Sequence, residues 1–134
     1  MRTIKNTIAK AFFIALSMFV GTSVHADWKK VVGSRGGTVY TDAAGKQRQG
    51  DTVKMWSLTD YKQPQAFKKI VIYSDKSWDE YDCKGRRIRV LHTEAYSDRM
   101  GNGTVVHRDT STSPWLPVAS GDSSEMLWKI ACDK

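Results

Sequence analysis

Hydrophobic and polar residues alternate along much of the chain, and this period of two is typical of half-buried β-strands. A first alternating run covers Trp28 to Val32, and a glycine-rich stretch over residues 33–37 separates it from Thr38 to Thr41. We expect these two runs to form an opening hairpin. Asp42 to Gly50 holds no apolar residue beyond two alanines, which predicts an exposed connection. The clearest strand then follows over Asp51 to Thr59, with apolar residues on both of its faces.

The second half of the chain continues in the same period. We expect Pro64 to end the preceding strand, because proline cannot donate to a β-ladder, and Phe67 to Tyr73 to form the next one. The longest alternation runs from Arg86 to Tyr96, and the Asn-Gly pair at 102–103 predicts a type I′ turn after it. Thr104 to Thr110 would then pair antiparallel with this long strand.

Strict alternation over Arg86 to Tyr96 also predicts which side chains share a face of the sheet. His92 and His107 would lie on paired strands, where they could be neighbours and two imidazoles could bind a metal ion if a third ligand were near. Two half-exposed strand histidines are the more common arrangement, and we expect that one. One predicted face carries Ile88, Val90, His92, Glu94 and Tyr96, and the other carries Arg87, Arg89, Leu91, Thr93 and Ala95.

The end of the chain changes to a helical period. Asp122 followed by Glu125 fits a capping box, in which a carboxylate accepts hydrogen bonds from the free backbone N–H groups of the first turn. Apolar residues then recur at helical spacing from Met126 to Ala131. The predicted fold class is therefore α+β and mainly β, a small antiparallel β-sheet with a C-terminal α-helix.

The N-terminus has the composition of a secretory signal peptide. Basic residues without acidic ones occupy residues 1–10, and an apolar run of 14 residues follows. We expect cleavage between Ala26 and Asp27, so that residues 1–26 are the signal peptide and residues 27–134 are one exported domain. The alternative, a retained membrane anchor, would need about 18–20 apolar residues. We therefore expect no membrane span after cleavage.

Charge and cysteine content narrow the choice of partners and compartment. Residues 27–134 contain 18 basic and 14 acidic residues, a formal charge of +4 against +7 for the whole chain. Because this excess is modest, we expect no nucleic-acid partner.

Cys83 and Cys132 are the only cysteines and allow one intramolecular disulfide, which is the default in an oxidising compartment. The alternative, a redox or metal-binding thiol pair, lacks a C-x-x-C motif. We expect the disulfide to tie the helix to the sheet.

The sequence contains no nucleophile elbow, zinc-binding helix or phosphate-cradling loop. Asp79, Glu80 and Asp82 lie close together, but carboxylates on one short segment rarely straddle a scissile bond. We expect a local salt-bridge arrangement instead, with Asp82 holding one of the arginines that follow. The sequence therefore predicts no catalytic, cofactor-binding or metal-binding residues, no cofactor and no enzymatic activity.

A basic segment follows these carboxylates and is the best candidate for a protein-binding surface. It carries four cations within six positions, which are Lys84, Arg86, Arg87 and Arg89. Such a run is more often a solvated face, and the sequence leaves this alternative open. As a binding surface it would attract acidic protein segments or sulfated polysaccharide at a rate that is sensitive to salt.

An Asp-Cys pair at 82–83 and the run Trp-Lys-Ile-Ala-Cys at 128–132 form a fairly specific pattern. Further positions of the same pattern cover nearly all of residues 27–134. With them the chain resembles the surface-adhesin protein E family. These positions are Trp28, Val39-Tyr40, Asp42, the stretch from Val53 to Tyr61, Tyr81, Arg89, Tyr96, Met100 to Gly103, Trp115 to Pro117, Gly121 and Leu127.

The resemblance implies a small antiparallel sheet with a disulfide-tethered C-terminal helix. It also implies an exported, non-enzymatic protein on the surface of a Gram-negative bacterium that binds a host extracellular-matrix or plasma protein, with a homodimer as a further assembly. Surface members can carry a lipidated cysteine at the mature N-terminus, where this sequence has Asp27. The alternative is a soluble periplasmic interaction or inhibitor-type protein with a bacterial protein partner, and the sequence leaves surface and periplasm open.

Overall fold

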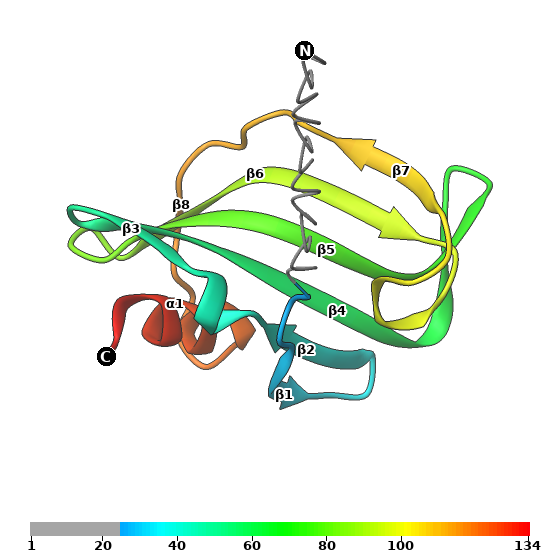
Figure 1. Cartoon of the computed structure of the whole chain (residues 1–134), viewed down its shortest axis with the longest axis horizontal. Helices are drawn as coiled ribbons and strands as arrows, with labels where there is room; N and C mark the ends of the chain where they lie inside the picture. The colour runs from blue at the N-terminus through cyan, green and yellow to red at the C-terminus, as the bar shows by residue number, and fades with distance from the viewer. Residues whose placement is uncertain (1–24) are drawn as a thin grey trace, which may run out of the picture.

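A computed structural model of the chain describes residues 25–134 (Figure 1). The predicted signal peptide, residues 1–26, lies outside this range except for its last two residues, so cleavage between Ala26 and Asp27 stays a prediction. Within the described range, no helix is long and apolar enough to cross a membrane.

The described residues form one antiparallel sheet with an α-helix at the C-terminal end of the chain. The main path of the sheet is β1-β2-β4-β5-β6-β7, while β3 pairs with β4 and β8 pairs with β6. The predicted fold class is confirmed. The elements are β1 (Lys29–Gly33), β2 (Gly37–Thr41), β3 (Gln47–Gln49), β4 (Thr52–Phe67), β5 (Ile70–Asp82), β6 (Arg87–Tyr96), β7 (Val105–Asp109), β8 (Leu116–Pro117), α1 (Ser123–Cys132) and the 3-10 turns η1 (Ala43–Gly45) and η2 (Arg99–Gly101).

The strand β4 is longer than predicted because it passes through Pro64. The register between β4 and β5 shifts around this proline, which lies in an exposed, irregular stretch where the ladder needs no N–H donor. The prediction that Pro64 ends the strand is therefore wrong. Phe67 ends β4 instead of starting a strand, and Lys68 and Lys69, with φ of 47° and 68°, form the turn into β5.

The connection between β6 and β7 differs from the predicted turn. Asn102 is extended, with φ −99° and ψ 174°, so residues 102–103 do not form a type I′ turn. The chain reverses instead at Met100 and Gly101, which have φ of 56° and 68°. Their backbone N–H groups donate to the Asp60 carboxylate at 2.9 Å and the Ser74 hydroxyl at 2.8 Å. Contacts with distant strands therefore select this turn over the one that the Asn-Gly pair favours locally.

A further difference lies between Asp42 and Gly50, where the predicted exposed connection contains η1 and the short strand β3. Strand β3 pairs with the start of β4, from Gln47 opposite Lys54 to Gln49 opposite Thr52. Its residues are polar and exposed, so the pairing uses backbone hydrogen bonds and leaves no hydrophobic pattern in the sequence.

A β-bulge in β6 reverses the predicted faces of that strand. Trp78 pairs with His92 and Asp79 pairs with Val90, so Leu91 is an extra residue without a partner across the ladder. The alternation therefore shifts by one residue, and the prediction that Val90 and His92 share a face is wrong. After the correction one face carries Ile88, Val90, Thr93 and Ala95, and the other carries Arg87, Arg89, His92, Glu94 and Tyr96.

The same shift separates the two histidines. His92 lies on the face of Trp56, with ring centroids 5.9 Å apart. His107 pairs with Ala95 on the opposite face, and its ring lies 5.0 Å from that of Phe67. The two histidines are therefore on opposite sides of the sheet and are not neighbours, and each is a half-buried strand residue, which is the arrangement that the sequence favoured.

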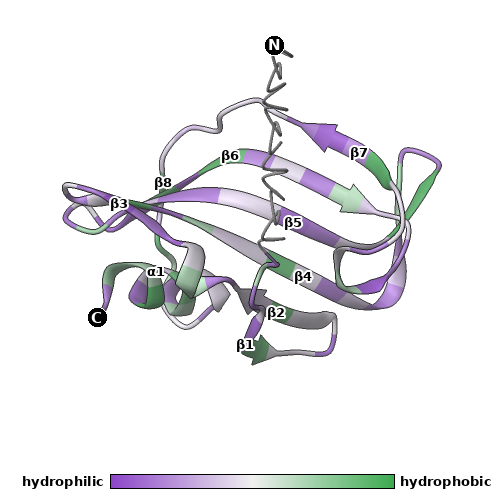
Figure 2. Ribbon diagram, viewed as in Figure 1, coloured by the Kyte–Doolittle hydropathy of each residue, from purple (hydrophilic) through white to green (hydrophobic). Residues whose placement is uncertain are grey.

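The helix α1 packs against one side of the sheet, which we call the helix face. Buried apolar residues of both elements form the core, and Figure 2 shows hydrophobic and hydrophilic residues following one another along the strands. The N-cap is the predicted one: the Asp122 carboxylate accepts from two backbone N–H groups, and Glu125 accepts from the Gly121 N–H at 3.2 Å. The core comprises Val53, Met55, Tyr81, Val118, Leu127, Trp128, Ala131 and Cys132.

Two further bonds fix the helix to the end of β5. Cys83 and Cys132 form the predicted disulfide. The Trp128 indole N–H donates to the Asp82 carbonyl at 2.9 Å. The disulfide and this hydrogen bond therefore hold the C-terminal part of the helix against the end of β5.

We expect Cys83→Ser to lower the melting temperature by at least about 10 °C. The disulfide spans 49 residues, and closing a loop of this length restricts the unfolded chain by about 4 kcal/mol, which is a large part of the stability of a small domain. Calorimetry with and without a reducing agent provides the measurement. Reduced wild-type protein should match the variant, and a change below 3 °C would show that the cross-link contributes little.

Candidate functional site

The predicted basic segment lies beside the disulfide, with Lys84 and Arg86 in the turn between β5 and β6 and Arg87 and Arg89 at the start of β6. Asp82 organises this turn, because one carboxylate oxygen accepts from the backbone N–H groups of Lys84 and Gly85 at 3.1 and 2.7 Å. The other oxygen accepts from the Arg87 guanidinium at 2.7 Å. The N–H of Gly85 foremost, followed by Arg87, lowers the pKa of Asp82. The expected tie between Asp82 and an arginine is therefore present.

Two other arginines of the segment are also held by carboxylates. Arg86 pairs with Glu125 of α1 at 3.1 Å, and Arg89 pairs with Glu80 across the strand at 2.6 Å. The carboxylates are the covered partners: the exposed fractions are 19% for Glu125 and 9% for Glu80, against 45% for Arg86 and 34% for Arg89. The surface therefore presents guanidinium groups rather than carboxylates.

Lys84 and Asp79 do not take part in these ion pairs. Lys84 is exposed and makes no ion pair within residues 25–134. Asp79 points to the helix face, away from the arginines. The structure thus brings together Arg86, Arg87 and Arg89 with their acidic partners, and leaves Lys84 as a cation without a carboxylate.

Indole rings lie directly against the guanidinium groups. Arg87 and Arg89 both lie over Trp115, with their guanidinium carbons 5.0 and 4.4 Å from the ring centroid, and Arg86 lies 5.1 Å from the centroid of Trp128. Each of these contacts is a cation–π pair. We call Lys84, Arg86, Arg87, Arg89 and Trp115 the arginine–tryptophan surface.

Trp115 is the member of this surface that sequence reasoning missed. It precedes β8, and the pairing of Leu116 with Ile88 and of Pro117 with Arg87 brings it beside the basic segment. The two residues of β8 are too few to show an alternation. The only signal in the sequence is a large aromatic residue between two prolines, which does not identify the distant strand that it contacts.

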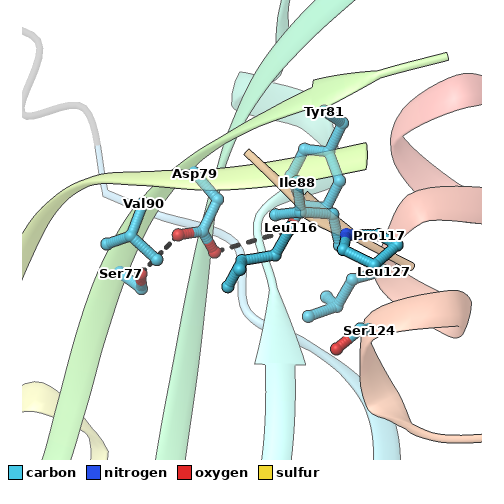
Figure 3. Close-up of a pocket in the computed structure, with 9 residues that line it drawn as sticks. All are labelled: Ser77, Asp79, Tyr81, Ile88, Val90, Leu116, Pro117, Ser124 and Leu127. Atoms are coloured by element: carbon cyan, nitrogen blue, oxygen red, sulfur yellow. Dashed lines mark hydrogen bonds between the residues drawn. The ribbon is translucent and has the colours of Figure 1, made fainter. Parts of the chain in front are cut away.

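A second candidate site is a cavity on the helix face, of about 240 Å³, between α1 and the sheet (Figure 3). Asp79 lies in its wall with only 6% of its surface exposed. Its carboxylate accepts from Ser77 at 2.5 Å, Ser57 at 3.3 Å and Tyr81 at 3.5 Å. Burial raises the pKa of Asp79 to about 6, and these hydroxyl donors offset only part of the increase.

The chemistry of this cavity is that of a buried acid among neutral hydroxyls. No lysine, arginine or histidine lines it, and the serine hydroxyls that contact Asp79 serve as its hydrogen-bond donors. Over residues 25–134, no three His, Cys, Asp or Glu side chains are grouped so that they could hold a metal ion. The arginine–tryptophan surface, by contrast, offers charged and aromatic groups to another molecule.

The structure is that of a small disulfide-linked β-sheet protein with a surface of arginine and tryptophan side chains. The model of the surface-adhesin protein E family matches residues 28–133, and the chain belongs to this family. Its type is therefore that of a surface adhesin.

Solved structures of protein E share the fold. The structure of Haemophilus influenzae protein E is similar with a TM-score of 0.62 and 14% sequence identity, covering 84% of this chain and 88% of that one. The crystal structure of protein E from non-typeable Haemophilus influenzae gives a TM-score of 0.60 at 14% identity, covering 84% of this chain and 79% of that one. No curated protein sequence matches this chain significantly.

We expect Asp79→Asn to stabilise the protein by about 1–3 kcal/mol at pH 7.5. The raised pKa means that the folded protein binds the proton more tightly than the unfolded chain, so wild-type stability falls between about pH 4 and pH 6 and then levels off. An amide cannot ionise, so the variant should lack this decrease. Urea unfolding from pH 4 to pH 8 measures both effects.

The matched control is Asp51→Asn, which removes the same charge from an exposed position. It should follow the wild-type pH profile within about 0.5 kcal/mol, as surface substitutions usually do. An Asp79→Asn variant that is less stable than wild type at pH 7.5 would contradict the assignment of Asp79 as a destabilising buried charge.

Proposed function

We propose that this protein is an exported, non-enzymatic adhesin that binds a host extracellular-matrix or plasma protein through the arginine–tryptophan surface. Membership of the adhesin family supports the type of protein. The observation that supports the site is the stacking of Arg87 and Arg89 on Trp115 beside the exposed Lys84.

This arrangement suits binding because its side chains are already ordered. Arginine and tryptophan are the residue types most enriched at the energetic centres of protein interfaces. The carboxylates of Glu80 and Asp82 and the ring of Trp115 hold the guanidinium groups in place, so less side-chain entropy is lost on binding. Their outer edges remain free to donate to an acidic segment of the partner.

The surface also combines two kinds of attraction. Lys84 adds an uncompensated positive charge, which speeds encounter with an acidic partner at low salt. Trp115 adds a large aromatic area, whose contribution depends little on salt. We infer that charge at this surface governs the association rate and that the indole governs the lifetime of the complex.

We expect Lys84→Glu to slow association and Trp115→Ala to speed dissociation, each by at least fivefold. Surface plasmon resonance on immobilised human plasma proteins and solubilised basement-membrane matrix, at 50 and 300 mM salt, measures the two rates. Lys62→Glu is the matched control, since it makes the same charge change at another exposed position. Equal binding by Lys84→Glu, Trp115→Ala and the control, with unchanged melting temperatures, would exclude this surface.

The proposal also requires that the protein reaches the cell surface. We expect protease to digest it in intact cells, and mass spectrometry to find Asp27 at the N-terminus of the exported protein. A periplasmic marker protein should stay protected in the same cells. If the protein is also protected until osmotic shock, host adhesion is excluded and a bacterial partner in the periplasm becomes the function to test.

A further inference from the structure

The helix face holds a second hollow, of about 440 Å³, beyond the part that α1 covers. Its lining includes Tyr61 and Phe67 of β4, Asp75 of β5, and Ala95 and His107 of β6 and β7. We call it the distal pocket. It lies far from the arginine–tryptophan surface, because Asp75 precedes the turn at the end of β5 by seven residues, or roughly 23 Å of extended strand.

The small side chain of Ala95 creates this pocket. Asp75, Ala95 and His107 lie opposite one another in a row across three strands, and Ala95 occupies the middle position. Neighbouring strands are about 4.8 Å apart, so Asp75 and His107 stand roughly 10 Å from each other with only a methyl group between them. Tyr61 and Phe67 form aromatic walls around this gap.

Carboxylates outnumber basic side chains in the lining of the pocket. Asp75 lies in its wall, and Asp109 lies at its exposed edge in the next row of the sheet. No lysine or arginine is among its lining residues. The Tyr61 hydroxyl, a neutral donor, donates to the Asp75 carboxylate. Among the described residues, Asp75 makes no ion pair. Burial accordingly raises the pKa of Asp75.

The aromatic wall is also suited to a cation. Phe67 is 40% exposed, so part of its ring is accessible to another molecule. The ammonium group of Lys68, in the turn that follows, lies 5.4 Å from the centre of this ring. The ring thus already takes part in one cation–π contact. The ring of His107 lies 5.0 Å from the same phenyl ring.

We propose that the distal pocket binds the cationic side chain of a lysine or arginine from a partner protein. The aliphatic part of such a side chain would pack on Phe67 and its charged end would pair with Asp75, the arrangement that long basic side chains adopt at apolar surfaces with a polar end. This site is independent of the arginine–tryptophan surface and selects the opposite charge.

The test uses single amino acids as probes of the pocket. Nα-acetyl-arginine amide and Nα-acetyl-lysine amide are titrated into ¹⁵N-labelled protein, with Nα-acetyl-citrulline amide and Nα-acetyl-norleucine amide as uncharged counterparts. We expect saturable shifts of the backbone signals of Ser77, Ala95 and His107 with the two cations only. Signals of the turn at Lys84 should not move.

Two variants test the two parts of the proposal. Asp75→Asn removes the charge and should weaken binding of both cations at least fivefold, whereas Asp51→Asn makes the same change far from the pocket and should have no effect. Ala95→Leu fills the gap while keeping the charge, and should abolish binding. Equal shifts from citrulline and arginine, or unchanged binding by Asp75→Asn in a folded protein, would overturn the proposal.

Discussion

The attachment of α1 to the end of β5 is the constraint on which both the core and the candidate surface depend. Within five residues, the chain from Asp82 to Arg86 contributes a carbonyl to the Trp128 indole, a sulfur to the disulfide and a guanidinium to Glu125. Each bond restrains the same turn from the side of the helix. The basic residues therefore stand on a cross-linked support, although the turn itself is exposed.

The sequence predicted the elements that depend on a local pattern of residues. The C-terminal helix, its Asp122 cap and the disulfide follow from local spacing and from a count of cysteines, because each involves a periodicity or a single pairing. Leu91 shows where this reasoning stops. A bulge adds a residue without changing the residue types, so the alternating pattern alone does not show it. The register between β5 and β6 determines which side of the sheet each residue after Leu91 occupies. Pro64 was misread for a related reason, since its effect depends on whether the partner strand needs its N–H.

The sequence predicted the basic residues of the arginine–tryptophan surface but not its tryptophan. Four basic residues in six positions are visible in any sequence, and so is the nearby group of carboxylates. The position of Trp115 depends on the pairing of two residues of β8 with β6, which no local pattern encodes. The separation of Asp79 from Glu80 and Asp82 likewise follows from strand alternation, because Glu80 and Asp82 are two residues apart and share one side of the sheet while Asp79 points to the other.

The length of α1 explains why the helix face has a covered and an uncovered end. Ten helical residues span about 15 Å, whereas the thirteen residues of β5 extend over roughly 43 Å. One helix of this size can bury only the part of the face near its disulfide. Beyond it the strands carry Asp79, Ser77 and Asp75 in succession, so polar groups replace apolar ones where the helix ends. Burying these carboxylates in an apolar core would cost free energy, so the face beyond the helix stays open as the distal pocket.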